Sequence, residues 1–348
     1  MKKIIVVLFI SVAVVLGSIY FLNRLLVEKQ NSLAGEKPVL IGFSMGTTRE
    51  ERWFKDRDLF VQKAQELGAV VSVTLSDYDV DKQISQIENL ISQGASVIVV
   101  LPADSEKIRP AIEKANQAGV KVIAYDRLIK NSDVDLYISF DNVKVGELQA
   151  TSILTAKSQG NFAYIGGSPT DNNAYLLKEG TMRALGPKIQ SGEIKLVVDK
   201  FTTDWKPEEA YKTMKDYLAS GQPIAAVIAA NDGTASGVIQ ALKEAGLGGK
   251  VPVSGQDAEL SACQRIIAGT QTVTVYKPII SLAFKAAEIA VAMASGQTPA
   301  TTDSIDNGKI NVPSYFLEPI SVDKNNMKET IIKDGFHTYE EVYQSVAK

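Results

Sequence analysis

The sequence of 348 residues contains one cysteine, Cys263, and one histidine, His337. A single cysteine excludes an internal disulfide. With one residue of each type, we expect no transition-metal site and no Ser/His or Cys/His nucleophile pair. No metal and no cofactor are therefore predicted. Cys263 lies in an apolar segment with a helical pattern, Leu260 to Ile267, and is interpreted as a buried, unreactive thiol.

An excess of positive charge is also missing. The formal net charge is −3, and no basic stripe is present that could displace counterions from a nucleic acid. The hydrophobic content of 45% is typical of a globular protein, and the length fits two domains of ordinary size. The chain is therefore expected to be globular and not to bind nucleic acid.

The N-terminus is the one long hydrophobic run. Lys2 and Lys3 precede an apolar stretch from Ile4 to Leu22, which is about the 20 residues that a membrane-crossing helix needs and longer than most signal-peptide cores. No cysteine is available there for lipid attachment. We interpret residues 1–37 as an uncleaved signal anchor and tether, with the bulk of the chain outside the cytoplasm. The alternative is a cleaved signal peptide, which would leave the protein secreted or periplasmic.

From Val39 onward, short β-branched runs alternate with helical periods. This alternation is typical of βαβ units and parallel sheets. One series ends near Phe140, and a second begins near Asn161. The fold class predicted from this pattern is α/β, with two lobes and a cleft between them.

Polar and aromatic side chains follow several of the predicted buried strands. In open α/β sheets, ligands bind beyond the carboxyl ends of the strands. Aspartate, arginine and asparagine together with tryptophan suit a small, neutral, hydroxyl-rich ring, so a sugar is predicted. The residues at these strand ends are Asp126, Arg127, Trp205, Asn231, Asp232, Gln256, Asp257 and Lys277.

Other interpretations of these residues remain open. Asp126 and Arg127 would also make a local ion pair on a loop, and Trp205 would also serve as a surface anchor. Asparagine and aspartate are both strong helix N-caps. We expect Asp232 to cap the following helix and to leave Asn231 free for a ligand.

Six sequence blocks resemble the periplasmic D-xylose-binding proteins, a branch of the ribose-type sugar-binding proteins. The similarity runs from about Val39 to His337. It is carried by Glu51-Arg52-Trp53-Phe54-Lys55-Asp56-Arg57-Asp58, Ala124-Tyr125-Asp126-Arg127, Tyr137-Ile138-Ser139-Phe140-Asp141-Asn142, Gly166-Gly167-Ser168-Pro169-Thr170-Asp171-Asn172-Asn173, Ser254-Gly255-Gln256-Asp257 and Thr274-Val275-Tyr276-Lys277-Pro278. The chain departs from this family at Ser44 to Thr48, which replaces acidic residues.

The resemblance implies a set of residues that contact a pyranose. They are Arg52, Trp53, Asp126, Arg127, Asp171, Asn173, Trp205, Asn231, Asp257 and Lys277. Sugar hydroxyls both donate and accept, which suits a wall of carboxylates, cations and amides. We expect the two tryptophans to sandwich the ring.

The resemblance also implies two Rossmann-like lobes with parallel sheets, joined by a hinge of three strands near Asp141, Lys277 and Asn311. The predicted N-terminal lobe is residues 38–141 with 278–311, and the predicted C-terminal lobe is residues 142–277 with 312–348. The N-terminal signal or transmembrane helix precedes both.

The function predicted is that of an extracytoplasmic, membrane-tethered D-xylose receptor, not an enzyme. Its lobes would close around the sugar and present the closed form to a membrane sensor histidine kinase. The alternative is the substrate-binding component of a xylose ABC transporter, with a permease as partner. A transcription repressor would need a helix-turn-helix ahead of the sugar domain, where this chain has its apolar run. A sugar isomerase or hydrolase would need a metal cluster or an activated nucleophile beside the carboxylates.

Overall fold

The computed structural model describes Arg24 and residues 38–344. The described residues from Leu40 onward form one compact unit. The predicted signal anchor and tether, residues 1–37, lie outside the described residues except for Arg24, which is helical. Of the helices that the structure describes, none has both the length and the apolar character needed to span a membrane.

A sheet of seven strands organises the first lobe. The strand order is β10-β11-β5-β4-β3-β1-β2, and all neighbours are parallel except β10 and β11. The strands are β1 (Leu40–Met45), β2 (Val70–Leu75), β3 (Val97–Leu101), β4 (Lys121–Tyr125), β5 (Leu136–Phe140), β10 (Asp303–Asp306) and β11 (Asn311–Leu317).

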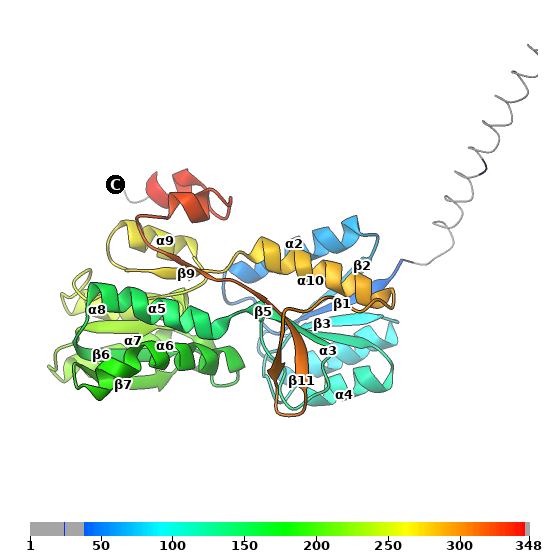
Figure 1. Ribbon diagram of the computed structural model, residues 1–348, viewed down its shortest axis with the longest axis horizontal. Helices are drawn as coiled ribbons and strands as arrows, with labels where there is room; N and C mark the ends of the chain where they lie inside the picture. Colours follow the sequence, from blue (N-terminus) through cyan, green and yellow to red (C-terminus); the bar gives the residue numbers. More distant parts are fainter. Residues whose placement is uncertain (1–23, 25–37, 345–348) are drawn as a thin grey trace, which may run out of the picture. The chain divides into compact units, whose positions relative to one another are not determined.

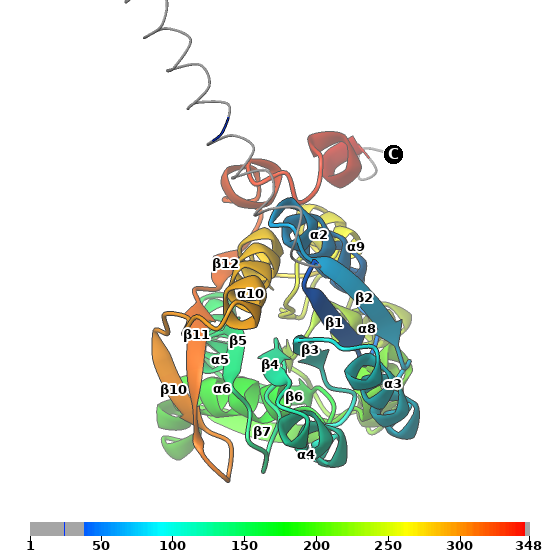
Figure 2. The same ribbon diagram turned by 90° about the vertical axis from the view of Figure 1, so that its right-hand side faces the viewer.

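Helices cover both faces of this sheet. In Figures 1 and 2, α2 (Arg52–Glu66) and α10 (Ile279–Ala294) lie on one face, whereas α3 (Val80–Ser92) and α4 (Arg109–Gln117) lie on the other. Strands covered on both sides need apolar side chains in both directions. The β-branched run of β3 accordingly has all five residues buried.

The second lobe contains a smaller parallel sheet and an antiparallel pair. Strands β6 (Gly160–Gly166), β7 (Ile194–Phe201) and β8 (Ala226–Ala229) pair in the order β7-β6-β8, and β9 (Thr274–Tyr276) pairs with β12 (Ile320–Val322). Parallel bridges Val227–Val253 and Gln256–Val275 connect the two sheets. The helices are α5 (Asn142–Ala156), α6 (Asn172–Gln190), α7 (Pro207–Ala219), α8 (Asp232–Glu244), α9 (Leu260–Ile267), and the short η1 (Thr203–Trp205), η2 (Lys328–Ile332) and η3 (Glu340–Gln344).

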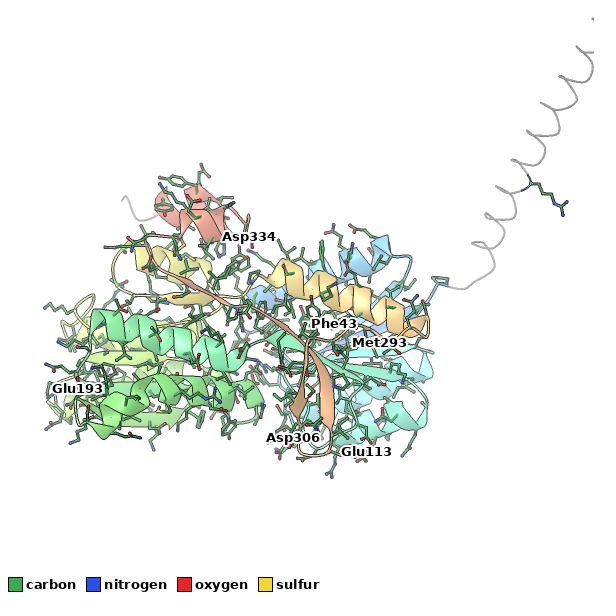
Figure 3. The ribbon with its side chains drawn as sticks, viewed as in Figure 1. Phe43, Glu113, Glu193, Met293, Asp306 and Asp334 are labelled. Carbon is green, nitrogen blue, oxygen red and sulfur yellow. The ribbon has the colours of Figure 1, made fainter. Side chains whose placement is uncertain are left out.

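Burial follows the layers of each lobe. Figure 3 labels Phe43 and Met293 in the first lobe, where both are buried, and it labels Glu113, Glu193 and Asp306 at outer positions, where all three are exposed. The sequence therefore folds as the predicted α/β protein with two parallel-sheet lobes.

The chain crosses between the lobes at three places. The first crossing, at Asp141, lies between β5 and α5, and the second, at Lys277 and Pro278, lies between β9 and α10. The third lies between Leu317 and Ile320, after β11, because β11 pairs with β5 in the large sheet. The third crossing was expected near Asn311, the first residue of β11, but it follows Leu317, the last residue of that strand. That expectation is therefore wrong. The predicted domain bounds remain a proposal, and this pairing argues for placing the last boundary after Leu317.

The strand that was predicted to end at Gln256 does not form. The segment before Gln256, Val251 to Gly255, makes only the single bridge at Val253. Pro252 has no backbone N–H to donate to a neighbouring strand, and a proline in a central strand is unfavourable for that reason. The segment nevertheless leads into Gln256 and Asp257 as expected.

Candidate ligand site

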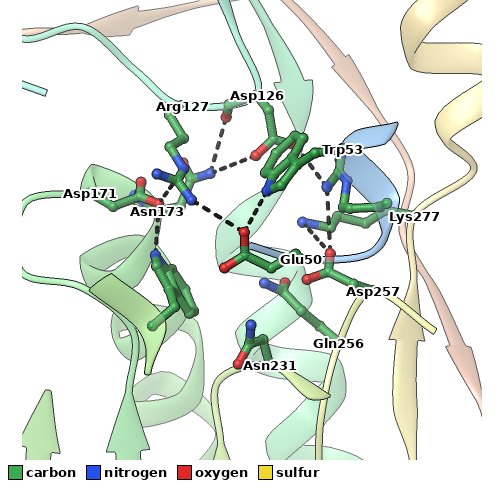
Figure 4. A pocket seen from close by; sticks show the side chains of 12 residues that line it. Glu50, Trp53, Asp126, Arg127, Asp171, Asn173, Asn231, Gln256, Asp257 and Lys277 are labelled. Atoms are coloured by element: carbon green, nitrogen blue, oxygen red, sulfur yellow. Dashed lines mark hydrogen bonds and ion pairs between the residues drawn. The ribbon is translucent and has the colours of Figure 1, made fainter. Parts of the chain in front are cut away.

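The predicted site residues meet in one cavity between the lobes. All ten line it, together with Glu50 and Gln256, and the empty space is about 270 Å³ (Figure 4). Charged, amide and aromatic side chains make up the lining of this cavity.

The carboxyl ends of strands supply several of the lining residues. Asp126 and Arg127 follow β4, Asn231 follows β8, and Lys277 follows β9. Arg52 and Trp53 come instead from the first turn of α2, and Asp171 and Asn173 come from the start of α6. Both lobes therefore contribute, as expected of a site at a lobe interface.

Three of the lining residues have a backbone conformation that side chains rarely adopt. The φ angles of Asp126, Trp205 and Asp257 are +61°, +59° and +89°. Each such residue costs on the order of 1–3 kcal/mol, and such residues cluster at functional sites. The geometry is consistent with side chains that are held in place for binding.

A buried ion-pair network surrounds Arg52. Its guanidinium lies 3.0 Å from Asp56 Oδ2 and 3.0 Å from Asp126 Oδ2, and its carbon lies 4.3 Å from the centre of the Trp53 ring. The Tyr125 hydroxyl donates to the other oxygen of Asp56 at 2.5 Å. Because Asp56 is fully buried, it holds Arg52 at a fixed position without facing the ligand itself.

Polar contacts cross from one lobe to the other inside the cavity. Arg127 Nε lies 2.8 Å from Asp171 Oδ2, and Asn173 Nδ2 donates to the Asp126 carbonyl oxygen at 3.0 Å. Asp257 Oδ1 of the second lobe lies 3.4 Å from Arg52 Nη1 of the first lobe and, within its own lobe, 2.9 Å from Lys277 Nζ. These pairs put donors and acceptors next to one another, as the two hydrogen-bonding directions of a hydroxyl require.

A second interlobe contact lies outside the cavity. The Ser105 backbone N–H donates to the Thr170 carbonyl oxygen at 2.9 Å, and the Asn172 N–H donates to Ser105 Oγ at 3.2 Å. The lobes are therefore joined on both sides of Asp171. This arrangement corresponds to a closed form.

Both tryptophans are buried in the lining. Trp205 Nε1 donates to Asp171 at 3.2 Å, and Trp53 Nε1 donates to Glu50. A Cβ atom at Gly167 would lie 2.1 Å from the Trp205 ring, so a glycine is needed for the ring to occupy its position. That the two rings sandwich a sugar stays a prediction.

Several buried polar atoms of the lining have no hydrogen-bond partner within the described part of the chain. They are Glu50 Oε1, Asp126 Oδ2, Arg127 Nη1 and Gln256 Oε1, of which Asp126 Oδ2 still has its ion pair with Arg52. Buried polar groups in native proteins are nearly always hydrogen-bonded. Three acceptors and a donor in one lining therefore indicate a polar ligand that offers both donors and acceptors, as hydroxyl groups do.

Burial and neighbouring charges shift the pKa values of the carboxyl groups in different directions. Burial raises the pKa of Glu50 and of Asp171, against the opposing effect of Arg127. Burial also acts to raise the pKa of Asp126, but Arg52, Lys277 and Arg127 together lower it below its ordinary value. Asp126 is therefore the most firmly ionised acceptor of these three.

Asn231, not Asp232, caps helix α8. The Asn231 side chain accepts from the Thr234 N–H at 2.8 Å, and Thr234 in turn accepts from the Asn231 N–H. The expectation that Asp232 caps and leaves Asn231 free is wrong, because Asp232 is taken up elsewhere. Its carboxylate accepts from Gln271, Thr274 and the Glu259 N–H, which ties the segment leading into β9 and the segment before α9 to the start of α8.

The raised pKa values of Asp232 and Glu259 should make the stability of the protein depend on pH. Burial raises the pKa of Asp232 to about 7 and that of Glu259 to about 8. Both values exceed those of the unfolded chain, so the folded state keeps protons that the unfolded state releases. Their stabilising contribution is complete below about pH 4 and is lost as the pH rises through the folded values.

We therefore expect the free energy of unfolding to fall by at least about 1.4 kcal/mol, the equivalent of one pKa unit, between about pH 5 and pH 9. Urea unfolding at several pH values measures it. Glu259→Gln should flatten the decline above about pH 6. An equal slope in the variant and the wild type would contradict the assignment to Glu259.

Glu50 and Gln256 complete the lining. The set implied by the family resemblance omits both, although Gln256 is one of the predicted strand-end residues. Gln256 stands directly before Asp257 at a recognised strand-end segment, so its position gave a usable signal. Glu50 lies in the loop between β1 and α2, where no periodic pattern marks it. Cys263 is fully buried, as predicted, and burial raises the pKa of its thiol.

Comparison with known proteins gives consistent similarities. Residues 41–298 match the family described as periplasmic binding protein domain. The D-xylose-binding periplasmic proteins of Haemophilus influenzae and Escherichia coli are 51% and 50% identical, each over 90% of this chain and 95% of that protein. A solved structure of an ABC transporter solute-binding protein from Clostridium phytofermentans, with bound β-D-glucose, superposes with a TM-score of 0.81 at 32% identity, over 87% of this chain and 99% of that one.

Proposed function

The chain belongs to the periplasmic binding protein domain family, and from this premise we propose that it binds D-xylose between its lobes as the substrate-binding component of an ABC transporter. The protein is a sugar-binding protein and not an enzyme. The observation that carries the proposal is the single cavity in which all ten predicted residues meet.

The chemistry of the cavity supports a pentose. Carboxylates of Asp126, Asp171 and Asp257 accept from hydroxyl groups, while Arg127 and Lys277 donate to them. Hydrogen bonds to charged partners contribute about 1.5–3 kcal/mol each, roughly twice as much as neutral ones. The two tryptophan rings offer flat apolar surfaces for the faces of a pyranose.

Closure of the lobes accounts for recognition by a partner. The contacts Arg127–Asp171 and Ser105–Thr170 join the lobes in the closed form. A ligand stabilises the closed form only to the extent that it binds the closed form more tightly than the open form. A sugar that contacts both lobes binds the closed form more tightly. The closed form then presents the surface that a partner recognises.

Transport is favoured over sensing as the role of that partner. A sensor histidine kinase was the predicted partner, but none of the similar proteins supports that role. The solved structure from Clostridium phytofermentans is described as an ABC transporter solute-binding protein. We therefore take a permease as the proposed partner.

The proposed location is outside the cytoplasm. Both D-xylose-binding relatives are described as periplasmic. Anchoring by the N-terminal apolar run stays a prediction, because that run lies outside the described residues.

Calorimetry on the full chain tests ligand choice. We expect D-xylose to bind at least about tenfold more tightly than ribose, arabinose, glucose or galactose, because a site built for specific hydroxyls leaves its polar groups unpaired with the wrong sugar. Equal or tighter binding of a hexose would contradict the xylose assignment. Capture of a histidine kinase without permease subunits, when the sugar-bound chain is purified from membranes, would contradict the transport role.

A further inference from the structure

Glu50 reaches into the cavity from the first lobe. It lies two residues before α2, and its side chain is only 5% exposed. Figure 4 shows its carboxyl group with Trp53 and Arg127 on one side and with Gln256 and Asn231 of the second lobe on the other. The carboxylate therefore faces the space between the lobes.

The two oxygens of this carboxylate differ in their surroundings. Oε2 accepts from Trp53 Nε1 and lies 3.9 Å from Arg127 Nη2. Oε1 is buried and has no hydrogen-bond partner among the described residues. An unpaired buried acceptor is unfavourable, so its position favours a ligand that brings a donor to it.

The charges of the lining lead to the same conclusion. Each of the other carboxylates of the lining has a cation close to it, since Asp126–Arg52, Asp171–Arg127 and Asp257–Lys277 are separated by 3.0, 2.8 and 2.9 Å. The nearest ion pair of Glu50 is the 3.9 Å contact with Arg127, which is already engaged with Asp171. Glu50 is therefore the least neutralised acid of the cavity.

We propose that Glu50 is a specificity-determining residue of the sugar site. Its Oε1 atom accepts a hydrogen bond from one hydroxyl of the bound pyranose, and the site thereby rejects sugars that carry at that position a group unable to donate. This inference rests on the proposed function.

The test exchanges an acceptor for a donor. In Glu50→Gln, the amide oxygen still accepts from Trp53 Nε1, and the NH₂ group takes the place of Oε1. The ligands are D-xylose and its three analogues with fluorine in place of the hydroxyl at carbon 2, 3 or 4. Fluorine cannot donate, so it is repelled by a carboxylate oxygen and tolerated by an NH₂ group.

We expect one analogue to respond differently from the others in calorimetry on the full chain. The ratio of the affinity for that analogue to the affinity for D-xylose should be at least about tenfold higher in the variant than in the wild type. A tenfold ratio corresponds to about 1.4 kcal/mol, close to the contribution of a hydrogen bond to a charged group. The other two analogues should change by the same factor as D-xylose. Glu66→Gln, the same substitution at an exposed position of α2, should change none of the ratios.

A structural role alone gives a different pattern. If Glu50 only supports Trp53, all four sugars weaken by one common factor and the inference is overturned. It is also overturned if no ratio changes. Glu50→Leu, which removes the acceptor without supplying a donor, must single out the same analogue. Failure of the wild type to bind D-xylose would instead reject the proposed function, and the role of Glu50 with it.

Discussion

Asp257→Asn should lower the affinity for D-xylose by at least about 100-fold, which corresponds to about 2.7 kcal/mol. Asp257 is 6% exposed, and its Oδ1 atom lies 2.9 Å from Lys277 Nζ and 3.4 Å from Arg52 Nη1. Removal of one partner of a buried ion pair costs about 3–5 kcal/mol, because the remaining charge is left uncompensated. Here two cations lose the same anion, inside the cavity that must close on the sugar.

Asparagine is the appropriate substitution because the φ angle of Asp257 is +89°. Asparagine tolerates positive φ about as well as aspartate does, whereas alanine would add backbone strain. The variant thus removes the charge while the backbone conformation is retained. Calorimetry against D-xylose measures the loss.

Asp216→Ala is the matched control, because Asp216 is an exposed acid on α7 of the same lobe. It should bind D-xylose as the wild type does. An Asp257→Asn variant within about tenfold of wild-type affinity would show that this carboxylate is not a main contact of the ligand.

The sequence was informative about the fold wherever local patterns determine structure. Helix α9 has the bounds of the predicted helical segment, Leu260 to Ile267, because its apolar residues recur with a helical period. The pairing of β11 with β5 joins residues far apart in the chain, and no local pattern encodes it. The position of the third crossing was wrong for that reason.

The candidate site was predictable to different degrees. Asp126, Asn231 and Lys277 stand at strand ends, so topology alone brings them to one edge of each sheet. Arg52 and Asp171 do not stand directly at the end of a predicted strand, and they were identified from the family resemblance. Glu50 has neither signal, and only the three-dimensional packing of its loop brings it into the cavity.

The capping role of Asn231 could not be predicted from the sequence either. Asparagine and aspartate in succession are equally good caps. The choice between them depends on Gln271 and Thr274, which approach Asp232 from another part of the chain and engage its carboxylate. A local rule therefore cannot decide which of the two residues faces the ligand.

Gly237→Ala should destabilise the second lobe, although alanine is the better helix former. Gly237 lies in α8, which packs against α7. A Cβ atom there would lie 2.1 Å from the Pro207 carbonyl oxygen and 2.9 Å from the Tyr211 nitrogen, both backbone atoms of α7. The helices must separate to admit it, so we expect the free energy of unfolding to fall by about 1–3 kcal/mol.

Gly233→Ala provides the matched control in the same helix. The nearest atoms to a Cβ at Gly233 lie at 3.6 Å in Asn231 and 3.7 Å in Pro207, which is ordinary van der Waals contact. The helix propensity of alanine should then act alone and raise the free energy of unfolding by up to about 1 kcal/mol. Urea unfolding followed by circular dichroism compares the two variants.

If Gly237→Ala lowers the free energy of unfolding and Gly233→Ala raises it, close packing of α7 against α8 requires glycine at position 237. Because Asn231 caps α8 and lines the cavity, a displaced helix should also weaken D-xylose binding in Gly237→Ala. Stabilisation by both substitutions would mean that α7 and α8 separate at little cost. In that case, the rigidity of the second lobe could not explain how Asn231 is held at the site.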